Sequence, residues 1–194
     1  LCLDRKEDIY KPQLRALLRA SAYGNIRIMI PLVTCIDELR EAKALIEEIK
    51  AELDEKNIAY KKDIQVGIMV ETAAASLIAD IFAKEADFFS IGTNDLTQYT
   101  MSVDRGNKKV SYLYSTFNPA VLRSIRHIIA CGREAGIMVG MCGEAASDPM
   151  MIPLLLAFGL NEFSMSASAI LRARKMVTEY SVEELQAVAD KAMS

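Results

Sequence analysis

The 194-residue sequence lacks several features that mark particular classes of protein. It has no tryptophan, no CxxC pair, and no apolar run near the ~20 residues that a membrane-spanning helix needs. With a formal net charge of −3 and basic residues scattered along the chain, it offers no electrostatic basis for binding nucleic acid or an anionic membrane. A secretory signal, a zinc ribbon and a disulfide scaffold all fit poorly. We therefore expect a cytoplasmic protein without nucleic-acid or membrane partners.

Cysteine and histidine are both scarce. The four cysteines lie far apart, and Cys2, Cys35 and Cys131 are expected to be reduced, buried and structural. Cys142 differs because it lies between small residues, and it is considered below. The only histidine, His127, lies inside a helical pattern, which predicts a structural or exposed residue and not a catalytic one.

The composition is that of an ordinary globular domain. Apolar residues make up 52% of the chain and charged residues 25%, and the length suits one domain with a substantial core. The chain begins without methionine and enters a helical pattern almost at once. We expect it to be a piece of a longer protein, with residues 1–194 forming a single domain.

Short apolar runs alternate with longer amphipathic segments. The runs have the length of buried strands and lack the alternation of half-exposed ones; they are Ile26–Val33, Ile64–Val70, Phe88–Ile91, Ile137–Met141 and Glu162–Met165. Helical spacing predicts helices at Lys11–Ala22, Ile36–Lys56, Ala73–Lys84, Ala120–Ala135, Asp148–Phe158 and Val182–Ala192. Asn118-Pro119 and Ser181 are good helix starts, and Gly136 and Gly159 are good stops.

Buried strands that alternate with helices predict an α/β fold with a parallel sheet. The pattern alone fits both an open doubly wound sheet and a barrel, although five strands are too few to close a barrel of eight. Neither GxGxxG nor GxxxxGK[ST] is present, so the usual nucleotide-binding versions lack support. The long irregular stretch Thr93–Phe117 is predicted to be a functional loop.

Reactive side chains follow three of the predicted strands. Glu71 follows the strand that ends at Val70, Asn94 and Asp95 follow the next, and Cys142 with Gly143 and Glu144 follows a third. In parallel α/β folds the carboxyl ends of the strands meet at one rim, where ligands bind. The sequence therefore predicts a functional site at this rim.

Glu71 and Asp95 together suit a hard divalent cation. Magnesium takes oxygen ligands and is held by one or two carboxylates plus substrate oxygens. The alternative is that each carboxylate caps a helix amino terminus. Because two carboxylates accompany Cys142 at one rim, we favour a magnesium site.

Arg105 and Cys142 are candidates for different tasks. Arg105, in Asp104-Arg105-Gly106-Asn107, has the planar fork that matches phosphate, although a surface turn with an exposed arginine is the more common fate of such a motif. Small neighbours let a ligand approach the sulfur of Cys142, whose neutral thiol can donate a proton.

Five segments resemble enzyme I of the bacterial phosphoenolpyruvate:sugar phosphotransferase system, a family of phosphoenolpyruvate–protein phosphotransferases. They keep the order and spacing of that family between about Lys11 and Val177, and they are Val70-Glu71-Thr72, the run Asp87–Thr100, Asp104–Asn107, Gly140–Glu144 and Glu162–Ser166. The resemblance implies a (β/α)8 TIM-type barrel that binds phosphoenolpyruvate, present here as about five βα units, and a dimer.

The resemblance also assigns roles to individual residues. Glu71 and Asp95 match the family's magnesium ligands. Asn94 and Arg105 match residues that hold the phosphoryl group, and Asp95 lies in the same substrate site. Cys142 matches the proton donor to the methylene carbon of enolpyruvate, giving pyruvate.

The family's phosphoacceptor histidine belongs to an amino-terminal domain, and this chain offers no candidate for it. The resemblance implies that the phosphoryl group passes from that histidine to a histidine-containing phosphocarrier protein for sugar uptake. The upstream strands are also expected to be missing, so this fragment alone is expected to be inactive.

Two other readings remain open at this stage. The chain also resembles the carboxy-terminal domain of pyruvate phosphate dikinase or phosphoenolpyruvate synthase, which share the cysteine-glycine strand end and the paired carboxylates. A binding or regulatory module without catalysis is the third reading, and the intact Glu71, Asp95, Arg105 and Cys142 argue against it.

Overall fold

The computed structural model describes residues 3–193 and places all five predicted strands in one sheet. Every neighbouring pair of strands is parallel. The strands are shorter than the apolar runs that predicted them: β1 (Ile28–Ile30), β2 (Val66–Val70), β3 (Phe88–Gly92), β4 (Met138–Cys142) and β5 (Glu162–Phe163).

The order of the strands separates the two architectures that the sequence left open. The sheet runs β1-β2-β3-β4-β5, so each strand pairs with the one that follows it along the chain. A doubly wound sheet reverses direction partway, whereas a (β/α) barrel keeps sequential order. The chain therefore forms a partial (β/α) barrel of five units.

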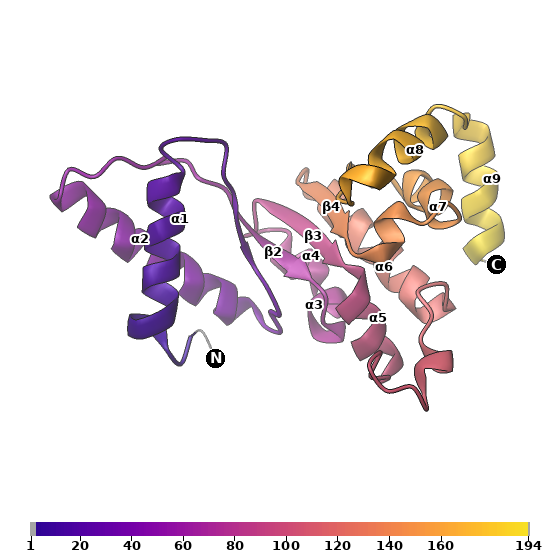
Figure 1. Cartoon of the computed structure of the whole chain (residues 1–194), viewed down its shortest axis with the longest axis horizontal. Coiled ribbons are helices and arrows are strands. Elements are labelled where there is room, and N and C mark those ends of the chain that lie inside the picture. Colours follow the sequence, from indigo (N-terminus) through magenta and orange to yellow (C-terminus); the bar gives the residue numbers. More distant parts are fainter. Residues whose placement is uncertain (1–2, 194) are drawn as a thin grey trace.

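Helices connect the strands and follow the last of them. Figure 1 shows α1 and α2 at one end of the molecule, α8 and α9 at the other, and the sheet between them. The bounds are η1 (Lys6–Tyr10, a π-helical turn), α1 (Lys11–Ala20), α2 (Ile36–Glu55), α3 (Ala73–Leu77), α4 (Ala79–Phe82), α5 (Thr93–Met101), η2 (Ser111–Leu113), α6 (Pro119–Glu134), η3 (Glu144–Ser147), α7 (Met151–Phe158), α8 (Ala167–Val177) and α9 (Val182–Met193).

The two faces of the sheet have different surroundings. One face, which we call the covered face, packs against helices: a Cβ on Gly132 of α6 would lie 2.2 Å from Cγ2 of Val139. Phe89 and Val139 of this face are almost completely buried. Because side chains alternate along a strand, Met29, Met69, Ser90 and Cys142 lie on the opposite face, which we call the inner face.

Two helices were not expected from the sequence. The prediction of an irregular stretch at Thr93–Phe117 is wrong for its first part, because α5 begins immediately after β3. Its threonines, asparagine and aspartate are weak helix formers, so the pattern gave little signal; Leu96 and Thr97 stabilise it by burial. Helix α8 was missed as well.

The helix boundaries mostly agree with the sequence. The predicted helix Ala73–Lys84 is interrupted at Ile78, which separates α3 from α4, and the one at Asp148–Phe158 begins at Met151. The side chain of Asn118 caps α6, and Ser181 accepts a hydrogen bond from the backbone of Glu184 in α9. Gly136 and Gly159 take positive φ at the ends of α6 and α7, as helix stops do.

The predictions that Cys131, Cys35 and Cys2 are buried have three different outcomes. Cys131 is buried, as expected, whereas Cys35 is exposed at the amino terminus of α2, so that prediction is wrong. Cys2 lies outside the described residues. His127 is exposed on α6, which is one of the two placements that the sequence predicted. Within residues 3–193, no helix combines the length and apolar character that crossing a membrane requires.

Candidate functional site

Glu71 lies at the carboxyl end of β2 and is 4% exposed. Its Oε1 accepts a hydrogen bond of 2.9 Å from the backbone N–H of Leu32, which lies in the loop after β1. Leu32 adopts a positive φ of 53°, a costly conformation for a leucine. Strain of this kind concentrates at functional sites, and here it aims a main-chain donor at a carboxylate.

The other carboxylate oxygen of Glu71 lies over Gly92, the last residue of β3. A Cβ on Gly92 would lie 2.7 Å from Oε2, so only glycine leaves this space for the carboxylate. Burial raises the pKa of the Glu71 carboxyl; the hydrogen bond from Leu32 lowers it, and the nearby Asp95 raises it again. A cation bound at this position would compensate the buried negative charge.

Asn94 and Asp95 lie in the first turn of α5, directly after β3. Asp95 Oδ1 is 3.8 Å from Nη2 of Arg105, and both side chains are partly exposed. Asn94 Oδ1 accepts a hydrogen bond of 3.4 Å from the backbone N–H of Glu144, which joins the rim of β3 to that of β4. The backbone N–H of Arg105 donates to Oε1 of Gln98, which holds the loop after α5 against that helix.

Cys142 is the last residue of β4 and is half-buried. Its carbonyl accepts a 3.0 Å hydrogen bond from the hydroxyl of Thr93, and the Ser90 hydroxyl donates to its sulfur at 3.8 Å. Burial raises the pKa of the thiol, the Ser90 hydrogen bond lowers it, and the charges of Glu71 and Glu162 raise it. The net increase keeps the thiol protonated at neutral pH.

The turn after Cys142 requires glycine. Gly143 has a φ of 96°, and a Cβ there would lie 2.3 Å from Oγ1 of Thr93 and 3.1 Å from Oδ1 of Asn94. Glycine is the residue that adopts this φ without strain. The backbone after β4 can therefore approach the first turn of α5 closely, and this places Cys142 at the same rim as that turn.

The helix-capping alternative for Glu71 receives no support. Helix α3, which follows β2, is capped by Thr72, whose Oγ1 accepts a 3.0 Å hydrogen bond from the N–H of Ala75. Helix α5 has Gly92 at its N-cap position and no side-chain cap. The carboxylate of Glu71 instead faces Asp95, as the causes of its raised pKa indicate.

The residues that are brought together suit a magnesium ion better than a metal held entirely by the protein. The described part of the chain contains no cluster of three or more histidine, cysteine, aspartate or glutamate side chains that could hold a metal. Magnesium does not need one, because it retains waters and substrate oxygens beside one or two carboxylates. Glu71 and Asp95 are the two carboxylates of this rim.

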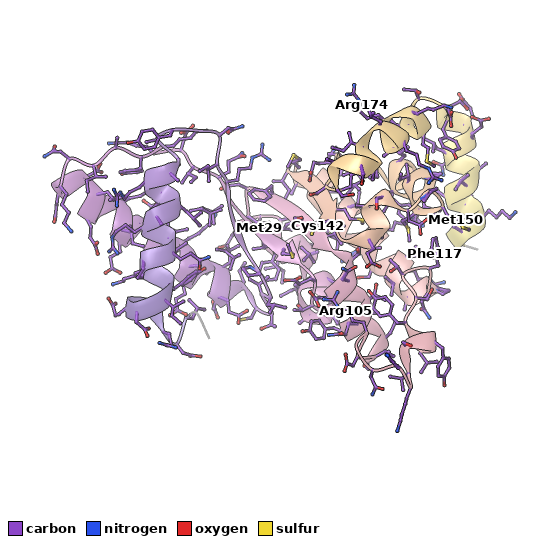
Figure 2. All side chains as sticks on the ribbon, viewed as in Figure 1. Met29, Arg105, Phe117, Cys142, Met150 and Arg174 are labelled. Carbon is purple, nitrogen blue, oxygen red and sulfur yellow. The ribbon has the colours of Figure 1, made fainter. Side chains whose placement is uncertain are left out.

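All five predicted site residues thus lie at or near the carboxyl rim. Glu71, Asn94, Asp95 and Cys142 come from three adjacent strand ends, and Arg105 joins them through Asp95. Figure 2 shows Cys142 at the middle of the molecule and Arg105 on the side where α5 lies.

Three contributors were missed from the sequence. Leu32 acts through its main chain, which no side-chain pattern reveals. Ser90 lies inside the mainly apolar strand β3, and Glu162 is the first residue of the short strand β5. For Ser90 the available signal was a polar residue within a buried strand, since such a residue needs a partner.

Comparisons with known proteins identify the family of the chain. Residues 1–182 match the sequence profile of a family described as PEP-utilising enzyme, PEP-binding domain, where PEP is phosphoenolpyruvate. The chain is 50% identical over 194 residues to a phosphoenolpyruvate-protein phosphotransferase of Priestia megaterium. Proteins of the same name from Geobacillus stearothermophilus and Bacillus subtilis (strain 168) are 53% and 52% identical.

Each of these relatives is much longer than the chain. The match covers all of the chain but 34%, 33% and 34% of the three relatives, so the chain spans about a third of their length. Among solved structures, a citrate lyase from Burkholderia xenovorans LB400 superimposes with a TM-score of 0.63 at 18% identity, covering 96% of this chain and 69% of that one. This similarity concerns the fold alone.

Proposed function

Because the chain belongs to the family of PEP-utilising enzymes, as a PEP-binding domain, we propose that it is the phosphoenolpyruvate-binding part of a phosphoenolpyruvate–protein phosphotransferase. The observation that carries the proposal is the position of buried Glu71 near Asp95, at the rim that also bears half-buried Cys142. The dikinase or synthase alternative is not favoured, because the relatives above at 50–53% identity are named phosphotransferases.

The residues of the rim would each have a separate role in binding the substrate. Glu71 and Asp95 would hold magnesium, which when bound neutralises phosphoryl charge. Arg105 would bind phosphoryl oxygens through its planar fork, and Asn94 would fix the phosphoryl group from the first turn of α5. Placing these donors before the reaction lowers the cost of charge that develops during phosphoryl transfer.

Cys142 would complete the reaction on carbon. When the phosphorus–oxygen bond of phosphoenolpyruvate breaks, the oxygen keeps the electron pair and leaves as the enolate of pyruvate. The S–H bond of Cys142 then breaks as a C–H bond forms at the methylene carbon, which gives pyruvate and a thiolate. A thiol whose pKa is raised by burial enters this step protonated.

The phosphoryl group would pass to a histidine outside this chain. His127, the only histidine, is exposed on α6, the helix that packs on the covered face, away from the inner face that carries Cys142. We infer that residues 1–194 form one domain and that another part of the protein supplies the phosphoacceptor histidine and upstream strands. That histidine would then pass the phosphoryl group, in the cytoplasm, to a histidine-containing phosphocarrier protein that serves sugar uptake.

A homodimer is part of the same proposal. Apolar side chains are exposed around the loop between α5 and α6 and beside η3; they are Tyr112, Leu113, Phe117 and Met150. Figure 2 labels Phe117 and Met150, which lie on the same side of the molecule. Exposed apolar groups of this kind are common at protein–protein contacts.

Calorimetric titration of phosphoenolpyruvate, with and without magnesium, tests the metal and substrate roles. Glu71→Gln and Asp95→Asn are each expected to weaken magnesium-dependent binding by about 10- to 100-fold, because each removes an anionic ligand. Cys142→Ala is expected to bind normally, since the thiol acts only in proton transfer. Glu144→Gln, an exposed carboxylate at the same rim, serves as the control. Magnesium-independent binding, or equal losses in Glu144→Gln, would contradict the assignment.

A further inference from the structure

The inner face of the sheet surrounds Cys142 with two polar side chains that the proposed reaction does not use. The strand register places Ser90 of β3 beside Gly140 of β4, and Gly140 beside Glu162 of β5. These three residues form one layer of the partial barrel, and Cys142 lies on the same face two residues beyond Gly140. Ser90 and Glu162 therefore flank β4 on its two sides, just below the thiol.

Ser90 makes a direct contact with the sulfur. Its hydroxyl donates to Sγ of Cys142 at 3.8 Å, across the pair of neighbouring strands. The covered-face positions on either side of Ser90, Phe89 and Ile91, are completely buried apolar residues. A hydroxyl between two such residues is directed to the inner face, where the sulfur accepts its hydrogen bond.

Glu162 approaches from the other side. A Cβ on Gly140 would lie 2.0 Å from Oε2 of Glu162, so the carboxylate lies directly over this glycine. Burial raises the pKa of Glu162, and the charge of Arg27 lowers it. Arg27 itself lies over the ring of Phe88 at 5.6 Å, lower on the inner face.

We propose that Ser90 and Glu162 are opposing positioning residues for Cys142: the Ser90 hydroxyl stabilises the sulfur after its proton has left, and the Glu162 carboxylate opposes that loss. The proposal rests on the proposed function for its consequence, the protonation of the enolate, but the effect on the thiol exists without substrate. Glu162 adds to the burial that keeps the resting thiol protonated, and Ser90 lowers the cost of the thiolate that forms when the proton moves to carbon.

The other charge that acts on the thiol favours its protonated form, as Glu162 does. Glu71, at the end of β2, is negative and disfavours the thiolate. Arg27 of the inner face acts on Glu162. Among the side chains that shift the pKa of Cys142, Ser90 is the one that lowers it. Removal of Ser90 and removal of Glu162 must therefore change the thiol in opposite directions.

The test is the rate at which iodoacetamide alkylates Cys142, measured between pH 7.5 and 10 without magnesium or substrate. The thiolate displaces iodide, an S–C bond forms, and peptide mass spectrometry separates Cys142 from the other cysteines. At pH 8, Ser90→Ala is expected to react about threefold more slowly, because one hydrogen bond is lost and the higher basicity of the thiolate partly compensates. Glu162→Gln is expected to react about twofold faster because a negative charge is removed.

Two further variants separate positioning from structural damage. Ser90→Thr keeps the hydroxyl and is expected to restore the wild-type profile. Met69→Leu changes the residue beside Ser90 on β2 without changing charge or hydrogen bonding, and its profile should equal that of the wild type. Rates that change in the same direction in Ser90→Ala and Glu162→Gln, or an unchanged rate in Ser90→Ala, would overturn the inference. Because no substrate is present, this result does not depend on whether phosphoenolpyruvate binds.

Discussion

On the covered face of the sheet, Ile68, Phe89 and Val139 are at most 1% exposed, whereas on the inner face of the same sheet Met29 of β1 is 39% exposed. The covered face is aliphatic and aromatic. The inner face carries glycine, serine, methionine, cysteine and glutamate, with Phe88 at its lower end. Because consecutive residues of a strand point to opposite faces, one strand supplies core packing on one side and reactive groups on the other. Residues that stabilise the fold and residues that carry the proposed chemistry are therefore neighbours in the sequence of a strand.

The largest expected effect comes from truncating neighbouring residues of β2. Ile68→Ala should lower the free energy of unfolding by about 3 kcal/mol, because it leaves a cavity under the helices. Met69→Ala should cost about 1 kcal/mol, because its side chain lies on the partly exposed inner face. Urea unfolding followed by circular dichroism measures both. Equal losses would mean that the two faces are packed alike.

A smaller difference in stability is expected between two glycine-to-alanine variants, one in α6 facing the covered side of β4 and one in β4 facing the inner side. In Gly132→Ala the new Cβ meets the buried side chain of Val139, so we expect a loss of about 1–2 kcal/mol after the gain in helix propensity. In Gly140→Ala the new Cβ meets only the flexible end of Glu162, which moves aside, so stability should change by less than about 1 kcal/mol.

Gly140→Ala has a second readout on the inner face. Displacing the Glu162 carboxylate should speed the alkylation of Cys142, as Glu162→Gln does, whereas Gly132→Ala should leave that rate unchanged. Thermal unfolding and alkylation together therefore distinguish the faces. A larger loss of stability in Gly140→Ala than in Gly132→Ala would contradict the comparison.

The smallest expected effect concerns the start of α2. Burial raises the pKa of Glu38, but hydrogen bonds from the backbone of Thr34 and Cys35 and from the Thr34 hydroxyl lower it below 4.5 overall. A lowered folded pKa stabilises the protein above the unfolded pKa, and this stabilisation is lost as pH falls through the folded pKa.

Glu38→Gln should therefore cost about 0.5 kcal/mol at pH 7, since the carboxylate is partly screened by solvent, and the difference from the wild type should shrink below about pH 4. Urea unfolding at several pH values measures it. Glu55→Gln, at the other end of α2, is the control. A difference that grows as the pH falls would contradict the sign.

The strands and the site rim could be predicted because they have short-range signals. Short runs rich in apolar residues mark the five strands, and a polar residue directly after each of three runs marks the rim. Helices α5 and α8 could not be predicted in the same way. The residues of α5 are weak helix formers stabilised by the contacts of Leu96 and Thr97, which exist only after β3 has packed. Sequence spacing also left the barrel and the open sheet unresolved, because strand order is a long-range property.

The residues that bear the proposed chemistry could be named from the sequence, but their supports could not. Cys142 was recognisable from its small neighbours, whereas its contact with Ser90 links residues 52 positions apart. Glu71 was recognisable from its place after a strand, whereas its partner at Leu32 is a main-chain group. Contacts between distant segments and contacts from the backbone leave no local pattern.

The donor at Leu32 has a consequence for how this region changes during evolution. Its contribution comes from the peptide group, so any residue that tolerates the left-handed backbone can occupy position 32 without removing the contact with Glu71. Selection at this position acts on backbone shape, and substitutions to glycine or asparagine are expected to be neutral where valine or isoleucine is not. An essential part of the site can thus be inherited while the identity of its residue drifts.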